Sequence, residues 1–405
     1  MKRFLETILS SILGVVVLGT ASLSAAADID VMTQNQYLGA DLASALGAAT
    51  AEPFDPVAAN AAFVDALGKI AARRPVERVR ALAAEIAKRN PDVVGLQEAF
   101  KFECTPSPGF PPLPSRGCDD PAIKGAFTDH LQNTEDALRG RYVVAGRVTN
   151  LKVDSIPFEV NGYRALFTIA DRDAILVREG IPVSWVNFVS IGACPKPSEQ
   201  GCNYQTAPPQ LGTPFGPVAL ERGFLAVDVT VKDRAYRVFN THLEQRLLGP
   251  NLPETRLLQV GQAYELVGTA LRTWDGSKTL IVVGDMNSDP RDRIPVPPFP
   301  ATLPGVPTLP VLTPYAVFTD NGFTDTWTLR PPIGSGRSCC QPEDLANPWP
   351  EFYERIDMIF SLTRPSHVLN MKLLGNKLGD KTRPPSNGRL WPSDHAALAA
   401  KLKFK

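Results

Sequence analysis

The sequence has no excess of charge of either sign, since 42 lysines and arginines balance 42 aspartates and glutamates in 405 residues. A neutral chain is not held on nucleic acid or on an anionic membrane by bulk electrostatics. Several enzyme motifs are also absent: there is no G-x-S-x-G, no H-E-x-x-H and no C-x-x-C. The stretch 375–382 resembles a phosphate-binding loop but has the wrong spacing. These absences argue against serine hydrolases, zinc enzymes and thiol redox proteins.

Long apolar runs are scarce as well. The run near the start covers residues 8–18, which is shorter than the roughly 20 residues that a membrane-spanning helix needs. Lys2 and Arg3 precede it, and Ala25 and Ala27 follow with the spacing of a leader cleavage site. We predict a signal peptide over residues 1–27 and a mature chain, 28–405, that is secreted or periplasmic. An uncleaved membrane anchor is the alternative.

Cysteines are few but even in number, and all six lie in stretches rich in Pro, Gly or Ser. An exported protein favours disulfides. The simplest pairings are local: Cys104 with Cys118, and Cys194 with Cys202. Cys339 and Cys340 are adjacent and pair with each other or elsewhere, because spacing alone does not fix connectivity.

The apolar residues follow both strand and helix periodicities. Strands are predicted at 29–33, 93–96, 173–178, 223–231, 236–240, 280–283, 354–362 and 398–404. Amphipathic helices are predicted at 57–72, 76–89 and 253–271. The 38 prolines indicate long irregular loops, notably at 290–314, and we also predict a loop at 103–122. No repeat or linker composition divides the chain, so we predict one domain over 28–405.

Polar side chains able to bind a metal or move a proton lie at the ends of five of these strands. They are Asn35, Glu98, His242, Asp285 with Asn287, and Asp394 with His395. A single polar residue at a strand end is most often a turn former or a cap. Five such ends in one chain indicate a shared site, because a strand end holds a side chain rigidly at an accessible rim.

Six short motifs occur in the order typical of one family. They are Thr33-Gln34-Asn35, Leu96-Gln97-Glu98, Asn240-Thr241-His242-Leu243, Gly284-Asp285-Met286-Asn287, Arg355-Ile356-Asp357 and Ser393-Asp394-His395. With them the chain resembles the endonuclease/exonuclease/phosphatase superfamily, which includes deoxyribonucleases, abasic-site endonucleases, bacterial sphingomyelinases and inositol-polyphosphate phosphatases. The resemblance spans nearly all of the mature chain. It implies an α/β fold, a four-layer sandwich of two mixed β-sheets with outer helices.

The resemblance further implies metal-dependent hydrolysis of a phosphate ester, in the first place a phosphodiester, by attack of water. Mg²⁺ prefers carboxylate and amide oxygens and neutralises the charge that phosphate oxygens gain during the reaction. Mn²⁺ and Ca²⁺ are alternatives. Glu98 is the best single metal ligand, with Asn35 beside it and Asp394 sharing the site.

The same resemblance assigns roles to the remaining residues. Asp285 orients or deprotonates the attacking water, and Asn287 holds phosphate or water. His395 transfers a proton or binds phosphate, and Asp357 fixes its tautomer. His242 donates to a phosphate oxygen in the transition state. Which histidine is the acid and which the base stays open.

Simpler interpretations stand beside these roles. His242 is alternatively an ordinary cross-strand polar residue, and Asp357 an ion-pair partner of Arg355 or Arg364. His130 and His367 fall in no motif, so we interpret them as ordinary surface or hydrogen-bonded histidines.

Five other residues lie in familiar surroundings. Tyr163, Asp171 and Asp173 are candidates for the position where many family members carry a phosphate-contacting Tyr or acidic residue. The pattern around them departs from the family's, so they receive no role. Arg222 and Asp325 are assigned to the fold rather than to the chemistry.

The substrate class stays open at this level. A nuclease needs a basic groove, and no basic run stands out. A sphingomyelinase-like or phospholipase-like enzyme needs an exposed apolar loop. The stretch 294–318, with Phe299 and Leu303, is a candidate for peripheral membrane contact, or it packs on its own protein. An inositol phosphate or another phosphomonoester is a further candidate substrate. A non-catalytic binding or adhesion protein is the alternative from a different class. We expect a monomer.

Overall fold

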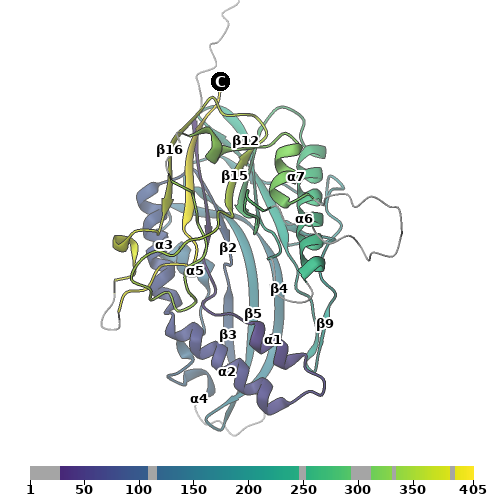
Figure 1. The fold of residues 1–405 in the computed structure, drawn as a ribbon, viewed down its shortest axis with the longest axis vertical. Coiled ribbons are helices and arrows are strands. Elements are labelled where there is room, and N and C mark those ends of the chain that lie inside the picture. Colours follow the sequence, from purple (N-terminus) through teal and green to yellow (C-terminus); the bar gives the residue numbers. More distant parts are fainter. Residues whose placement is uncertain (1–27, 108–115, 246–251, 293–311, 331–333, 384–387) are drawn as a thin grey trace, which may run out of the picture.

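The computed structural model describes residues 28–107, 116–245, 252–292, 312–330, 334–383 and 388–405 (Figure 1). The predicted signal peptide, residues 1–27, lies outside them, and so do Phe299 and Leu303 of the candidate membrane loop. Within the described residues, no helix is long and apolar enough to span a bilayer.

The first sheet has seven strands. In order across the sheet they are β16 (His367–Leu374), β17 (Ala397–Lys403), β1 (Asp28–Asn35), β2 (Val93–Gln97), β5 (Tyr163–Arg178) and β3 (Lys101–Pro106), and β4 (Tyr142–Val160) also pairs with β5. β1 and β2 are parallel, whereas the other neighbours are antiparallel. The sheet is therefore mixed.

The second sheet has eight strands. In order they are β14 (Thr324–Asp325), β15 (Asp357–Ser361), β13 (Thr279–Asp285), β12 (Arg234–His242), β11 (Gly223–Val231), β8 (Gly201–Asn203) and β7 (Pro197–Ser198), and β6 (Val183–Trp185) also pairs with β11. β12 and β13 are the parallel pair. A separate hairpin joins β9 (Leu211–Thr213) to β10 (Gly216–Val218).

The two sheets pack face to face through alternate residues of their strands. Val31 and Ile175 from the first sheet meet Val227, Val238 and Ile281 from the second in one buried cluster. Successive side chains of a strand point to opposite faces, so the intervening residues point outward to the helices. Strands covered on both faces, such as β2 and β13, are therefore buried along their whole length.

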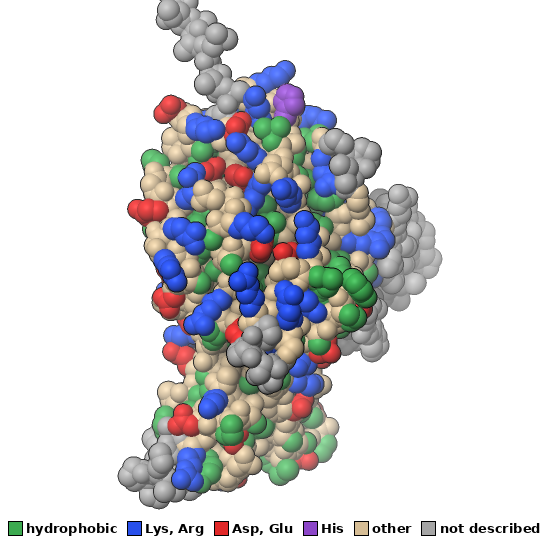
Figure 2. Space-filling view, turned by 90° about the vertical axis from the view of Figure 1, so that its left-hand side faces the viewer, with side chains coloured by type: hydrophobic (Ala, Val, Ile, Leu, Met, Phe, Trp, Pro, Cys, Tyr) green, Lys and Arg blue, Asp and Glu red, His purple; other side chains and the backbone are tan. Residues whose placement is uncertain are grey.

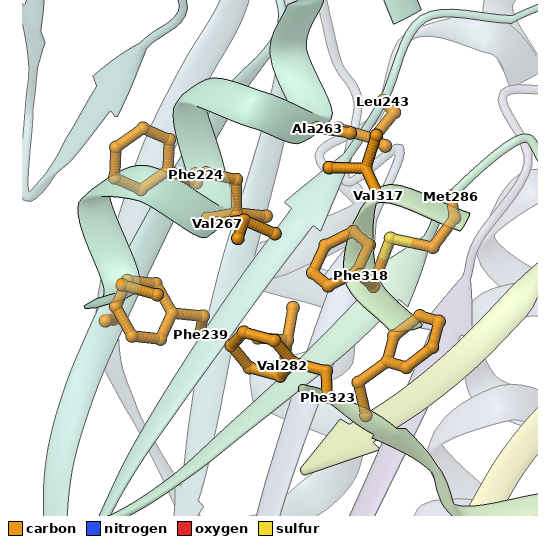
Figure 3. Close-up of a cluster of buried hydrophobic side chains, with 14 of the residues drawn as sticks. Phe224, Phe239, Leu243, Ala263, Val267, Val282, Met286, Val317, Phe318 and Phe323 are labelled. Atoms are coloured by element: carbon orange, nitrogen blue, oxygen red, sulfur yellow. The ribbon is translucent and has the colours of Figure 1, made fainter. Parts of the chain in front are cut away.

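Helices cover both outer faces. α3 (Pro75–Arg89) and α5 (His130–Leu138) pack on the first sheet. On the second sheet, Val267 of α6 (Leu252–Arg272) and Phe318 of α7 (Pro314–Asp320) belong to one cluster with Phe239 and Val282 (Figure 3). The predicted four-layer sandwich is confirmed. The remaining helices are α1 (Ala43–Ala49), α2 (Pro56–Ala72) and α4 (Arg116–Asp119), with short 3₁₀ turns at Lys124–Ala126, Thr326–Leu329 and Leu378–Asp380.

Local signals explain the predicted helices. Asp55 caps α2 by accepting hydrogen bonds from the amides of Val57 and Ala58, and proline occupies the first helical position. α3 ends at Asn90, which adopts the left-handed conformation common at helix C-termini and is followed by Pro91. Both helices therefore agree with the predicted ranges to within a residue.

The loop predictions are partly wrong. The expected loop at 103–122 includes the end of β3 and the helix α4. The strand predicted at 173–178 is the end of a much longer one, because β4 and β5 form an extended hairpin over 142–178. In the stretch 294–318, Val317 and Phe318 belong to α7 and are fully buried, so this end of it does not contact a membrane.

The six cysteines form three local disulfides. Cys104 pairs with Cys118 and Cys194 with Cys202, as predicted, with Cα–Cα distances of 5.7 and 5.6 Å. The adjacent Cys339 and Cys340 pair with each other, which selects one of the two alternatives that the sequence left open.

The surface beside α3 and β16 carries many basic side chains (Figure 2). Carboxylates lie among them, and some form ion pairs, such as Arg74 with Glu77 at 2.9 Å and Lys88 with Glu85 at 3.6 Å. This face is therefore mixed in charge, which agrees with the neutral net charge of the chain.

Candidate active site

Two pairs of parallel strands, one pair in each sheet, bring polar side chains to one edge of the sandwich. In the first sheet, β1 ends at Asn35 and β2 ends at Gln97, just before Glu98. In the second sheet, β12 and β13 end at His242 and Asp285, which face each other in register. The carboxyl ends of parallel strands meet at one edge of a sheet. Asn35 therefore contacts Glu98, which is 63 positions away in the sequence, and Asp285, which is 250 positions away.

Asp285 is the centre of the group. Its Oδ2 atom lies 3.2 Å from Asn35 Nδ2, 3.6 Å from His242 Nε2 and 3.7 Å from His395 Nε2. Its Oδ1 atom accepts a hydrogen bond from the backbone amide of Asn287 at 2.9 Å. Burial raises the pKa of Asp285, and the charge of His395 opposes that rise. The structure thus brings the predicted acid, amide and imidazole groups together.

Glu98 and Asn35 form a second contact pair. Asn35 Nδ2 donates to Glu98 Oε1 at 3.1 Å, and the amide of Leu38 donates to Glu98 Oε2 at 3.0 Å. The backbones of Glu98, Tyr37 and Asn287 are left-handed, with φ of 54°, 56° and 46°. Such conformations are uncommon outside glycine and cluster at functional sites.

His395 is held by a carboxylate and by backbone contacts around it. Its Nδ1 atom lies 2.9 Å from Asp357 Oδ2. The Ser338 hydroxyl accepts from the amide of Asp357 at 3.2 Å, and the Ser393 hydroxyl donates to the Asn35 carbonyl at 2.8 Å. Burial alone would lower the pKa of His395, but the carboxylates around it, led by Asp357, outweigh burial and raise it. The ring is therefore favoured in its protonated form.

Asp357 is predicted either to orient His395 or to form an ion pair with Arg355 or Arg364. Arg355 does not pair with Asp357, because its Nη2 atom lies 2.7 Å from Asp325 Oδ2. Asp325 thereby serves the fold, as expected.

The surroundings of His242 favour the neutral ring, in contrast to those of His395. Arg222 Nη1 lies 3.0 Å from its Nδ1 atom. Burial lowers the pKa of His242, and the positive charges of Arg222 and His395 add to the effect. A guanidinium can only donate, so Nδ1 accepts and the proton of the neutral ring is placed on Nε2. This Nε2 atom lies 3.1 Å from Asn287 Nδ2, a second donor, so the two groups leave room for an acceptor between them only when one of them turns away. Arg222, which the sequence assigned to the fold, therefore also contacts a candidate catalytic side chain.

A buried acidic layer lies behind Arg222. Asp171 Oδ2 is 3.6 Å from Arg222 Nη1, and Asn150 Nδ2 donates to Asp173 Oδ2 at 3.0 Å. Burial raises the pKa of Asp171 against the effect of Arg222, and burial and Asp171 raise that of Asp173. Tyr163, by contrast, is hydrogen-bonded to Arg116 at the far end of β5, away from this layer.

Asn240 of the Asn-Thr-His motif connects the two sheets. Its Nδ2 atom donates to the carbonyls of Leu96 at 2.9 Å and Ala174 at 3.0 Å, and its Oδ1 atom accepts from Gln97 Nε2 at 2.6 Å. Position 95 must be glycine for this contact, because a Cβ atom there would lie 2.4 Å from Asn240 Oδ1. The motif therefore contributes a structural clamp as well as His242.

The sequence reasoning did not identify Arg78, which joins two of the site loops. It is fully buried and donates to the carbonyls of Gln36 at 3.1 Å, Tyr37 at 2.9 Å and Pro392 at 3.0 Å. Burial lowers its pKa to about 10. An arginine in an amphipathic helix normally lies on the solvent face, so the helical pattern around it carried no signal of this role.

The donor set suits a divalent cation. Burial raises the pKa of Asp394, and the nearby carboxylate of Glu98 contributes to the rise. A hard cation binds carboxylate and amide oxygens and relieves such repulsion. Among the described residues, Asp285, Asp357 and His395 form a compact group of side chains that could bind a metal, because their ligand atoms lie within 4.8 Å of one another. Cys339 and Cys340 also adjoin His395 but are joined in a disulfide and offer no thiolate.

These buried polar groups lie at one edge of an α/β sandwich, and a comparison with family models identifies the family. The model described as the Endonuclease/Exonuclease/phosphatase family matches residues 59–395. The chain therefore belongs to this family, whose members are hydrolases that act on phosphate esters. The comparison with curated proteins found no match.

Three solved structures illustrate the likeness. An endonuclease/exonuclease/phosphatase family protein from Bacteroides thetaiotaomicron is 16% identical, with a TM-score of 0.48, over 94% of this chain and 99% of that one. Truncated Caenorhabditis elegans TDP2 is 14% identical, with a TM-score of 0.46, over 93% and 98%. The mannosyl-6-phosphatase Bt3783 of Bacteroides thetaiotaomicron is 17% identical, with a TM-score of 0.46, over 93% and 100%. These values are too low to bear on the substrate.

Proposed function

We propose that the protein hydrolyses a phosphodiester, with water as the nucleophile and a divalent cation as cofactor. The observation that carries the proposal is the contact of the Asp285 carboxylate with Asn35, His242 and His395, all within 3.7 Å. A carboxylate between two imidazoles of opposite protonation preference is suited to moving protons during hydrolysis. Membership of a family of phosphate-ester hydrolases supports the same class of reaction.

Glu98, Asn35 and Asp394 would hold the cation, with Mg²⁺ preferred and Mn²⁺ or Ca²⁺ as alternatives. When bound, it neutralises charge that develops on the phosphate oxygens. Asn35 presents its Nδ2 atom to Glu98 and Asp285, and its Oδ1 atom accepts from the amide of Tyr37 at 2.9 Å. Its oxygen would therefore serve as a ligand only after the side chain turns over and gives up the bond to Tyr37.

Asp285 would orient the attacking water and accept its proton. The backbone amide of Asn287 fixes the Asp285 carboxylate, and the Asn287 side chain donates to the carbonyl of Leu243 at 2.9 Å. Asn287 is thereby positioned to hold the phosphate or the water beside Asp285.

The two histidines would act on the phosphate from different protonation states. His395, kept protonated by Asp357, is suited to donate a proton to the leaving oxygen. His242, kept neutral by burial and Arg222, is suited to donate a hydrogen bond from Nε2 to a non-bridging phosphate oxygen. Arg222 and Asp357 are positioning residues in this scheme.

Hydrolysis of bis-p-nitrophenyl phosphate, with and without Mg²⁺ after treatment with a chelator, tests the proposal. We expect Glu98→Ala to weaken metal-dependent activity and His395→Ala to lower kcat by about 10²–10⁴-fold. His367→Ala is the matched control, because His367 is exposed on β16. Activity that is absent in the wild type, or that survives both Glu98→Ala and His395→Ala, would favour the non-catalytic binding protein.

A phosphomonoesterase is distinguished in the same assay. Preference for p-nitrophenyl phosphate over the diester would replace the phosphodiesterase proposal with that alternative. Plasmid DNA, sphingomyelin and inositol phosphates, compared side by side, would then narrow the natural substrate.

We also propose that the mature chain is exported. Three disulfides among the described residues support an oxidising compartment. Amino-terminal sequencing of protein recovered outside the cytoplasm is expected to begin at Asp28, and a mature chain that retains residues 1–27 would contradict the proposed cleavage.

A further inference from the structure

A large apolar pocket lies at the end of the molecule where α1 and α2 cover the far halves of β4 and β5 (Figure 1). Its volume is about 690 Å³, within the range of about 300–1,000 Å³ typical of small-molecule sites. Ala45 and Leu46 of α1 form part of one wall, and Ile169 and Phe167 of β5 form part of another. The pocket is partly open to solvent, so a ligand can enter it from solution.

The residues that line the pocket favour a hydrocarbon ligand. Only two of the lining residues are charged, Glu159 and Arg164, and they pair with each other at 3.1 Å. The polar Asn60 exchanges hydrogen bonds with the backbone of Glu159, and Asn161 donates to Asp120. Because these polar side chains are already engaged, the pocket offers little to a charged or polar group and much to an apolar chain.

The pocket lies close to the candidate active site along β5, although none of its lining residues belongs to that site. Odd-numbered residues of β5 share one face: Ile175 lies in the core between the sheets, Asp173 and Asp171 form the acidic layer, and Ile169 lines the pocket. Two residues of a strand span about 7 Å. The pocket therefore begins at Ile169, two residues along β5 from Asp171.

A second chain segment makes the same connection. Leu220 lines the pocket two residues before Arg222, which contacts both Asp171 and His242. Arg222 thus lies between the end of the pocket at Ile169 and Leu220 and the candidate active site.

We infer that the pocket binds the hydrocarbon chain of an amphiphilic phosphodiester whose phosphate is hydrolysed beside Asp285. This inference rests on the proposed function for the position of the phosphate, whereas the apolar pocket stands on its own geometry. The ligand carries a long hydrocarbon chain, because the lining is apolar and its two charged residues pair with each other.

The substrate test compares p-nitrophenyl hexadecyl phosphate with p-nitrophenyl ethyl phosphate, both used as monomers in solution. We expect kcat/KM to be at least tenfold higher for the hexadecyl ester. Ala45→Trp fills part of the pocket and should lower the ratio of the two kcat/KM values at least fivefold. Ala43→Trp is the matched control, since Ala43 lies on the same helix but is exposed and outside the pocket. Equal kcat/KM values for the two esters in the wild type would overturn the inference.

A binding test separates the pocket from the chemistry. Titration of the wild-type protein with dansyl-undecanoic acid should give saturable fluorescence enhancement, reversed by hexadecylphosphocholine and weakened at least tenfold by Ala45→Trp. Absence of binding would refute the pocket as a hydrocarbon site and would favour filling by residues of the chain itself. If the probe binds but neither ester is hydrolysed, the proposed function fails and the hydrocarbon site remains.

Discussion

His130 offers a direct test of how burial controls stability in this protein. It is fully buried at the first position of α5, and its ring lies 6.1 Å from that of Phe102 at a steep angle. Neither ring nitrogen forms a hydrogen bond of good geometry with a described residue. Burial lowers the pKa of His130 to about 3, with Arg78 adding to the effect and Asp129 opposing it. His130 is therefore not a surface histidine.

The sign of the effect follows from the two states. An unfolded histidine takes up a proton near pH 6.5, whereas the folded His130 does so only near pH 3. Between these values the unfolded chain binds the extra proton, so the free energy of unfolding falls as the pH falls. The contribution is complete above pH 6.5. From pH 7.5 to 5.0 the loss from this group is about 2 kcal/mol.

Urea unfolding at pH 7.5 and 5.0, followed by tryptophan fluorescence, measures this loss. We expect the free energy of unfolding of the wild type to drop by about 2 kcal/mol more than that of His130→Leu, which cannot take up the proton. His367→Asn, at an exposed histidine, should keep the pH dependence of the wild type. The same pH dependence in wild type and His130→Leu would refute the reasoning.

Three further predictions concern the sandwich and the site. Asn240→Leu removes three hydrogen bonds between the sheets and should lower the free energy of unfolding by about 2–4 kcal/mol. The exposed Thr230→Val should change it by less than about 0.5 kcal/mol, and equal urea midpoints for the two variants would contradict the clamp. The Cβ atom of Gly95→Ala would lie 2.4 Å from Asn240 Oδ1, so this variant should lower the free energy of unfolding by about 1–3 kcal/mol in the same experiment. A urea midpoint equal to that of the wild type would contradict this prediction. Asp357→Asn should lower kcat on bis-p-nitrophenyl phosphate by about 10²–10⁴-fold with little change in KM, and an unaltered kcat would remove Asp357 from the mechanism.

Much of the fold and of the candidate site could be predicted from local patterns. The 3.6-residue and two-residue periodicities identified α2, α3 and the central strands, because each of these elements buries a face of its own. The short motifs identified Asn35, Glu98, His242, Asp285 and His395, because each follows or precedes a strand whose apolar pattern is unmistakable. These signals lie within a few residues of one another, so no knowledge of packing was needed to find them.

Other features depended on residues that are far apart in the chain. Arg222 and Arg78 look like ordinary surface arginines in their own segments, and their roles arise from His242 and from the loops at Gln36 and Pro392. The extended β4–β5 hairpin has exposed polar positions that interrupt its apolar alternation. The apolar pocket is formed by separate segments, including α1, α2 and β5. Charge, burial and cavity volume at such positions are set by what packs against them, and that is decided only when the two sheets and their helices come together.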